Sequence, residues 1–331
     1  MLAAAPNALK RFARFGLHRL GGLRPLIWSS RKRFRILTYH RLSSVLYPGA
    51  AAALDRQCAF LRSQFHPLPL SEIARSLNTG AALPPGALAV TVDDGYRDFL
   101  VDGFPIFRKW RIPVTVFLMT DFVDRKLWPW WNQVAYAAQH GRARRVRLSL
   151  TPKRDEQQLP LETEVQRQSA ADAICALVKK LPNRGRLAFL DRLAELFELE
   201  MPRQAPPEHA PLTWDDARRL AADGVEFGAH TKTHPILPRV EDEELIVDEI
   251  AGSKARVEQE LGRPAIHFCY PNGDYNSEGV DVVARCGFQS AVTVDAGLNT
   301  RRADRYLLKR LPVALDLPDE YFREQVAGMH V

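Results

Sequence analysis

Two groups of potential metal ligands lie far apart in this sequence of 331 residues. Asp93 and Asp94 are adjacent, and His230 and His234 are separated by three residues. Neutral imidazoles with one carboxylate form a three-ligand set that leaves a position open for water, as in a catalytic zinc site. A spacing of four also places two side chains on the same face of a helical turn. These residue types predict a mononuclear metal site for hydrolysis.

The acidic pair follows a short run of small and β-branched apolar residues, 87–92, which is typical of a buried parallel strand. Successive side chains of a strand point in opposite directions, so the two carboxylates can have different roles. One could bind a metal ion while the other accepts a proton. Gly95 permits a tight turn after the strand. An Asp-Gly turn that caps a helix explains this segment equally well when it is taken alone.

A strand-like run, 225–229, also precedes the two histidines. Chance matches to a His-x-x-x-His spacing are common, and a pair of surface or capping histidines fits this segment by itself. The functional residues of α/β proteins lie where parallel strands end, and these ends meet at one edge of the sheet. The shared strand-end position of the acids and the histidines therefore favours a common site.

A third strand-like run, 266–270, is followed by Pro271, Asn272 and Gly273. Proline followed by glycine forces a sharp and rigid loop after the strand. Such a loop can present a backbone N–H to a developing oxyanion. An ordinary turn that leaves a strand is the simpler interpretation unless another feature links this loop to the first two segments.

A family resemblance provides that link. Residues 91–95 (Thr-Val-Asp-Asp-Gly), 230–234 (His-Thr-Lys-Thr-His) and 268–273 (Phe-Cys-Tyr-Pro-Asn-Gly) resemble the three motifs of polysaccharide deacetylases, the NodB-homology group of carbohydrate esterase family 4. The resemblance covers about residues 33–315. It implies an α/β fold, a distorted (β/α) barrel with fewer than eight regular strands. It also implies a metal-dependent hydrolase that removes acyl groups from amino sugars.

The resemblance implies a role for each matching residue. Asp94, His230 and His234 would bind the metal, and Asp93 would be the general base that takes a proton from water. The backbone N–H of Tyr270 would help to bind the oxyanion. Zinc is the expected ion, although nickel, cobalt or manganese would suit a similar set of ligands. We also expect substrate contacts from Tyr96, Pro271, Asn272, Trp130 and Trp131.

The sequence departs from the family pattern in two places. Cys269 stands where the third motif usually has an arginine that orients the base. Arg310 could replace that arginine from a late strand, or it could be a surface charge at the barrel end. The usual late Leu-x-His motif, which supplies the general acid, is absent. A subgroup of the family has a Tyr-His near its start instead, so we expect His40 to be the acid, with a packed or capping histidine as the alternative.

Strand-like and helix-like segments alternate after residue 33, which fits a barrel of parallel strands. The pattern breaks at about residues 124–212, which we interpret as a helical insertion on the catalytic side. The insertion opens with Trp128-Pro129-Trp130-Trp131, whose indoles could stack on sugars, lie in a membrane interface or form the insertion's own core. The expected strands are 35–40, 87–92, 114–118, 225–229, 266–270 and 290–294, and the expected helices are 54–65, 71–77, 96–110, 164–181, 186–199, 241–261 and 277–286.

The positive charge is concentrated at the start of the chain. The total is +7, but residues 1–54 contain ten Lys and Arg and no acid, so the remainder has 36 basic and 39 acidic residues and a net charge of −3. We therefore divide the chain into a basic arm, 1–32, and a barrel, 33–331. Residues 9–20 fit an amphipathic helix that could lie on an anionic membrane through residues 8–35 or pack on the barrel. We expect no nucleic-acid binding, because the charge is confined to the arm.

The remaining composition is that of a globular protein, with 46% hydrophobic and 26% charged residues. Four scattered cysteines match no zinc-finger spacing and indicate free thiols in a reducing compartment. No secretory signal or run of ~18 apolar residues is evident, so we expect a cytoplasmic protein, peripheral on the inner face of the membrane if the arm binds there.

Together these features predict an N-deacetylase of an amino-sugar glycan or lipid-linked saccharide in bacterial cell-surface polysaccharide synthesis. The alternatives are a deformylase or O-deacetylase that acts on a glycolipid, and a non-catalytic relative that binds glycans or membranes. The presence of Asp93 together with all three expected ligands counts against a non-catalytic protein.

Overall fold

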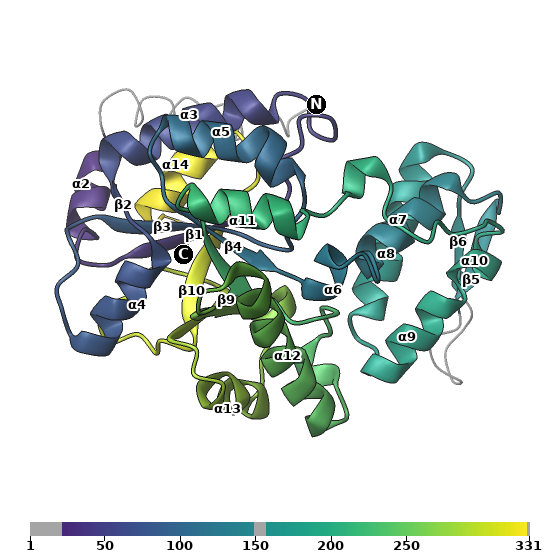
Figure 1. Ribbon diagram of the computed structural model, residues 1–331. Helices are drawn as coiled ribbons and strands as arrows, with labels where there is room; N and C mark the ends of the chain where they lie inside the picture. Colours follow the sequence, from purple (N-terminus) through teal and green to yellow (C-terminus); the bar gives the residue numbers. More distant parts are fainter. Residues whose placement is uncertain (1–21, 149–156, 330–331) are drawn as a thin grey trace, which may run out of the picture.

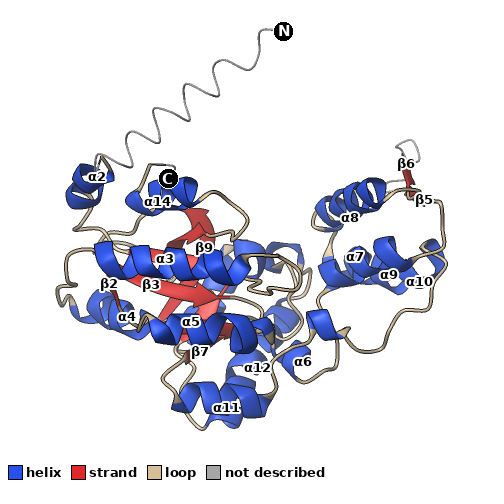
Figure 2. Ribbon diagram, turned by 90° about the horizontal axis from the view of Figure 1, so that it is seen from above, coloured by secondary structure: helices blue, strands red, loops and turns tan. Residues whose placement is uncertain are grey.

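Parallel pairing closes a barrel of seven strands in the computed structural model, which describes residues 22–148 and 157–329 (Figures 1 and 2). β1 (Arg35–Tyr39) pairs with both β3 (Ala87–Val92) and β10 (Leu308–Pro312), and this double pairing closes the sheet. The expectation of a distorted barrel with fewer than eight regular strands is therefore confirmed. The strands follow one another around the ring in chain order, through β4 (Val114–Leu118), β7 (Glu226–Ala229), β8 (His267–Cys269) and β9 (Ser290–Ala296).

Alternating side chains divide the strands into an inner and an outer face. Ile36, Ala89 and Phe117 belong to a cluster inside the barrel, whereas their neighbours Val90 and Leu118 pack outward against the helices. The same alternation places Thr38, Thr91, Asp93 and Arg310 on the inner face, nearer the C-terminal ends of their strands. A polar layer thus lies above an apolar one, and it forms the floor of the site described below.

Helices surround the barrel and largely follow the expected boundaries (Figure 1). The clearest difference is at residues 96–110, where one helix with a kink near Pro105 was expected. The chain instead forms a π-helical turn, Phe99–Gly103, and then α5 (Phe104–Lys109), because Pro105 has no N–H to continue one regular helix. The other helices are α2 (Leu23–Ser29), α3 (Ala50–Gln64), α4 (Leu70–Thr79), α6 (Thr120–Val123), α11 (Trp214–Ala222), α12 (Glu243–Leu261), α13 (Ser277–Arg285) and α14 (Asp319–Ala327), and short β2 (His66–Pro67) pairs with the start of β3.

The insertion forms a lobe of its own beside the barrel (Figure 2). Its core contains Trp130, Val134, Ala137 and Ala138, and their helical spacing is the sequence signal of a helix that is not among those expected. The expected helix at 186–199 is broken into two. The elements of the lobe are α7 (Trp130–His140), the antiparallel pair β5 (Arg145–Leu148) and β6 (Gln157–Pro160), α8 (Glu164–Val178), α9 (Asn183–Asp191) and α10 (Leu193–Leu196).

The expected amphipathic helix at residues 9–20 lies outside the described residues. The described part of the basic arm is α2, which packs near α14. No helix within residues 22–148 and 157–329 is both long enough and apolar enough to cross a bilayer.

Candidate active site

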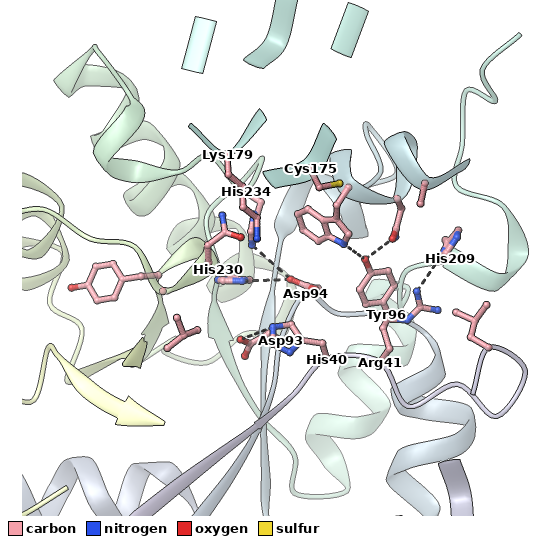
Figure 3. Close-up of a pocket in the computed structure, with 18 of the residues that line it drawn as sticks. His40, Arg41, Asp93, Asp94, Tyr96, Cys175, Lys179, His209, His230 and His234 are labelled. Atoms are coloured by element: carbon pink, nitrogen blue, oxygen red, sulfur yellow. Dashed lines mark hydrogen bonds and ion pairs between the residues drawn. The ribbon is translucent and has the colours of Figure 1, made fainter. Parts of the chain in front are cut away.

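An open cavity of about 570 Å³ lies between the C-terminal ends of the strands and the insertion. The predicted base, the predicted metal ligands and His40 all line it, and Cys175 of α8 and Lys179, directly after that helix, line it from the opposite side (Figure 3). Segments that are widely separated in the sequence thus meet at one edge of the barrel, as expected for a parallel α/β fold.

The acidic pair lies directly after β3. Asp94 has a φ of 73° and Gly95 a φ of 86°, both in the left-handed region that residues other than glycine seldom adopt. A Cβ atom on residue 95 would lie 2.7 Å from Leu118 Cδ2, so the turn also requires glycine for space. This turn separates the two carboxylates, since Asp93 faces Arg310 and Asp94 faces the histidines.

Arg310 forms a buried, two-point ion pair with Asp93. Its Nη1 and Nη2 atoms each donate to one carboxylate oxygen of Asp93 at 2.8 Å, and Arg310 is fully buried. The alternative of a surface charge at the barrel end is therefore wrong. Burial by itself raises the pKa of Asp93, but the charges of Arg310 and His40 outweigh it and hold that pKa below its usual range. Asp93 is thus an oriented carboxylate near neutral pH.

Cys269 explains how an arginine from a different strand reaches the base. Its Sγ lies 3.2 Å from Arg310 Nη2 and 3.5 Å from Asp93 Oδ2, beside the ion pair. A thiol is small, so it leaves the guanidinium of β10 room to approach Asp93. Burial raises the pKa of Cys269, which favours a neutral thiol there. A nearby group of Asp93, His230 and Cys269 could in principle bind a metal, but both oxygens of Asp93 are already engaged by Arg310.

The histidine segment is a loop and not the helical turn that the spacing suggested. Thr231 and His234 have φ angles of 63° and 57°, which no right-handed helix contains. Glu249 of α12 holds this loop, because its carboxylate accepts hydrogen bonds from the backbone N–H groups of Lys232 at 2.7 Å and Thr233 at 2.9 Å. Sequence reasoning missed Glu249, since only the folded chain brings α12 beside the loop.

The two histidines nevertheless face one carboxylate. The Nε2 atoms of His230 and His234 lie 3.5 and 3.8 Å from Asp94 Oδ1 (Figure 3). Burial, and then the charge of His230, lower the pKa of His234 to about 3, so its ring is neutral near pH 7. Burial alone would lower the pKa of His230, but Cys269 and Asp94 more than offset this and raise it. A proton therefore competes with a metal ion for His230.

These residues fit a divalent metal ion. Asp94 Oδ1 is buried and has no hydrogen-bond partner within residues 22–148 and 157–329, an arrangement that is costly for a carboxylate unless a cation satisfies it. The Nδ1 atom of His230 lies 2.7 Å from the carbonyl oxygen of Cys269, which selects the tautomer whose Nε2 lone pair faces Asp94. One carboxylate and two imidazoles are the donors that zinc accepts in catalytic sites.

His40 lies at the edge of this group. It follows β1 directly, and its Nε2 is 3.6 Å from Asp93 Oδ2. Its side chain is 48% exposed, into the cavity, so the alternative of a packed histidine is wrong. An exposed imidazole beside the base can exchange protons with a bound substrate.

The role expected for the Tyr270 backbone needs correction. Its N–H donates to the carbonyl oxygen of Val292 at 3.2 Å, as part of the pairing between β8 and β9, and is not free for an oxyanion. The side chain of Asn272 is a better donor at this position. Asn272 lines the cavity with a φ of 54°, and its buried Nδ2 atom has no hydrogen-bond partner among the residues described.

The other expected substrate contacts divide into two groups. Trp131 and Tyr96 line the cavity, whereas Trp130 lies in the core of the insertion and Pro271, the first residue of the loop 271–273, is buried. Direct contact of Trp130 or Pro271 with a substrate is therefore not supported. The cavity also contains side chains that the sequence did not single out, namely Arg41, Gln168, Cys175, Lys179 and His209.

Replacing Arg310 with methionine should destabilise the fold in a pH-dependent manner. Removing one partner of a buried ion pair typically costs ~3–5 kcal/mol. In the wild type the pKa of Asp93 is lowered, so the pair stabilises the fold above the unfolded pKa of about 4 and this contribution is lost as the pH falls. In Arg310→Met, burial would raise the pKa of Asp93, so the cost should be largest at pH 7 and shrink towards pH 4. Urea unfolding at both pH values measures this, and an equal cost at both would contradict the ion-pair interpretation.

Comparisons with known proteins agree with this geometry. A family model described as "Polysaccharide deacetylase" matches residues 163–291, which contain the histidine loop and the third motif. This match covers 129 of the 331 residues, and over that segment it confirms the expected resemblance to the polysaccharide deacetylases. The match begins within the insertion, so it does not include the acidic pair, His40 or α7.

Related proteins support the family and the fold to different extents. The poly-β-1,6-N-acetyl-D-glucosamine N-deacetylase of Escherichia coli is 30% identical over 114 residues, which are 30% of this chain and 16% of that protein. YxkH of Bacillus subtilis, itself named only as a candidate polysaccharide deacetylase, is 25% identical over 118 residues, 36% of this chain and 42% of YxkH. The chain thus matches less than half the length of either relative.

Solved structures of deacetylases share the fold over nearly the whole chain. The Streptococcus pyogenes deacetylase PplD, in complex with acetate, has a TM-score of 0.58 and 16% identity, and the match covers 89% of this chain and 98% of PplD. IcaB from Ammonifex degensii has a TM-score of 0.58 and 18% identity, over 90% and 97% of the two chains. At such low sequence identities, the structural similarity shows a shared fold and nothing more specific.

Proposed function

We propose that this protein is a polysaccharide deacetylase that removes N-acetyl groups from an amino-sugar glycan and depends on a divalent metal ion. The observation that carries the proposal is the buried carboxylate oxygen of Asp94, which faces two imidazoles and has no hydrogen-bond partner in the part of the chain that the structure describes. The oriented base Asp93 and the exposed imidazole of His40 lie beside this group in one open cavity. Ligands, base and acid are therefore all within reach of one bound acyl group.

Asp94, His230 and His234 would hold the ion. When bound, a divalent metal supplies a Lewis acid that polarises an amide carbonyl and lowers the pKa of an attacking water. Asp93 accepts the proton of that water as the O–C bond forms. Arg310 keeps the carboxylate of Asp93 ionised and fixes its direction through two hydrogen bonds.

His40 would complete the reaction by protonating the leaving nitrogen. The C–N bond breaks as that nitrogen gains a proton, so the products are acetate and the free amine of the sugar. The 3.6 Å separation of His40 Nε2 and Asp93 Oδ2 would let the proton taken from water be returned through His40. The unpartnered Nδ2 of Asn272 would donate to the acyl oxygen or to the sugar.

Acetate release from a panel of acylated oligosaccharides tests the proposed function. The relative from Escherichia coli is named for poly-β-1,6-N-acetyl-D-glucosamine, so β-1,6-linked N-acetylglucosamine oligomers are the first substrates, with β-1,4-linked oligomers for comparison. N-formyl and O-acetyl analogues distinguish the deformylase and O-deacetylase alternatives. We expect chelator-sensitive acetate release from an N-acetylated oligomer. Tight metal binding and saccharide binding without release from any member would instead support the non-catalytic alternative.

We also propose that the basic arm brings the enzyme to the inner face of the membrane, where a lipid-linked saccharide of cell-surface polysaccharide synthesis could be its substrate. The support within the described residues is local. Trp28 is 64% exposed at the end of α2, and the Arg31 guanidinium lies 4.4 Å from the centre of its ring. Arginine with an exposed indole suits an anionic lipid interface. Co-sedimentation with anionic vesicles but not with neutral ones is expected, and equal recovery from both would contradict membrane docking.

A further inference from the structure

The two expected histidine ligands are held in different ways. His230 is oriented by a hydrogen bond, since its Nδ1 atom lies 2.7 Å from the carbonyl oxygen of Cys269. The Nδ1 atom of His234 is buried and has no hydrogen-bond partner among the described residues. Metal-binding histidines nearly always use the second ring nitrogen to fix their orientation. The orientation of His234 therefore depends on another contact.

That contact comes from the insertion. The ring of Trp131 packs edge-on against the ring of His234, with centroids 4.6 Å apart and an interplanar angle of 62°. His234 contacts the ring of His230 on another side, with a centroid distance of 4.7 Å. The imidazole of His234 is thus confined between an indole and the other expected ligand, and Trp131 limits its rotation away from Asp94.

Trp131 is itself fixed to the loop that carries Asp94. Its Nε1 atom donates to the hydroxyl of Tyr96 at 3.1 Å, and Asn132 Nδ2 donates to the same hydroxyl at 2.7 Å (Figure 3). Tyr96 is buried and lies two residues after Asp94. One network therefore connects both ends of the ligand set through the first turn of α7.

The end of the insertion is tied to the same loop. The N–H of Arg97 donates to the carbonyl oxygen of Ala210, and the N–H of Leu212 donates to that of Gly95, both at 2.9 Å. Arg41 packs over the Tyr96 ring at 4.1 Å and donates to the backbone oxygen of Glu208 at 2.6 Å. The beginning and the end of the insertion thus both hold the segment that follows Asp94.

We propose that Trp131 is a positioning residue for His234, so that the insertion is a structural part of the metal centre and not only a wall of the substrate cavity. The proposal rests on the metal-dependent function proposed above. Trp131 lies outside the segment matched by the family model, so that match does not assign it a role. Trp131 would replace, by ring packing, the hydrogen bond that His230 has and His234 lacks.

Metal binding by the full chain, without any substrate, tests this proposal. Trp131→Ala and Trp131→Phe would be titrated with Co²⁺, following the visible absorption bands of the ion, and with Zn²⁺ against a competing chelator. Trp130→Phe is the matched control, because the neighbouring indole lies in the insertion core and does not line the cavity. Thermal unfolding of each metal-free variant reports structural damage separately.

We expect Trp131→Ala to weaken metal binding by roughly 10–100-fold and to change the Co²⁺ absorption bands, as loss of an outer contact to a ligand does. Trp131→Phe keeps an aromatic ring, so its metal affinity should lie between that of Trp131→Ala and that of the wild type. Trp130→Phe should lower the unfolding temperature but leave metal affinity unchanged. The proposal would be overturned if Trp131→Phe had the metal affinity and the Co²⁺ absorption bands of the wild type. It would also be overturned if Trp130→Phe and Trp131→Phe weakened metal binding equally. A wild-type chain that binds no metal would overturn the proposed function itself.

Discussion

Asp93→Asn should lower the rate of acetate release by ~10²–10⁴-fold, the range typical for loss of a general base, while the enzyme still binds its metal ion. Asparagine has nearly the shape of aspartate but accepts no proton from water. The carboxylate of Asp93 faces Arg310 and His40. The carboxylate oxygen that faces His234 belongs to Asp94. The effect should therefore be on the catalytic step and not on the metal.

The measurement compares turnover and metal content in the same protein samples. Asp124→Asn is a suitable control, because the side chain of Asp124 is only 5% exposed and pairs with an arginine, Arg256 at 2.9 Å, but does not line the cavity. The control should lose stability and retain turnover in its folded fraction. Wild-type turnover in Asp93→Asn would exclude Asp93 as the base.

Asp94→Asn should strongly weaken metal binding and should also lower the stability of the metal-free protein. It removes the anionic ligand, so we expect metal affinity to fall by at least ~10²-fold, since a neutral amide oxygen is a much weaker ligand for a divalent ion than a carboxylate. Without metal, the variant should also be less stable than the wild type near neutral pH, because it loses the attraction between the Asp94 carboxylate and protonated His230. The backbone should not be strained further, since asparagine tolerates the φ of 73° at this position.

Urea unfolding with and without Zn²⁺ measures both parts of this prediction. A ligand that binds only the folded state at 100 times its Kd adds about 2.7 kcal/mol to the free energy of unfolding. This gain should be present in the wild type and absent in Asp94→Asn at the same Zn²⁺ concentration. An equal gain in both proteins would show that the ion binds elsewhere.

The parts of the site that could be predicted are those that local sequence determines. Asp93, Asp94, His230 and His40 each follow a strand, and parallel strands place their ends together. Short apolar runs predicted these strands well, and β3 and β4 have the expected boundaries. The order of three motifs then connected segments that no periodicity could connect.

The remaining features depend on contacts between distant segments. The partner of Asp93 could not be decided until β10 was seen between β1 and β9, where the guanidinium of Arg310 is buried inside the barrel and reaches Asp93. The histidine loop departs from a helical turn because Glu249, on another element, binds its N–H groups. The N–H of Tyr270 is engaged by strand pairing, which a motif comparison does not reveal.

The central claim is tested most directly by adding Zn²⁺ in steps to metal-free protein and measuring acetate release from the best N-acetylated oligomer. The arrangement of Asp94, His230 and His234 around one position predicts that turnover is absent in the stripped protein. It should then rise in proportion to added metal and reach its maximum at one ion per chain. Full turnover in the stripped protein, or a maximum reached only at two ions per chain, would contradict a single metal centre at these residues.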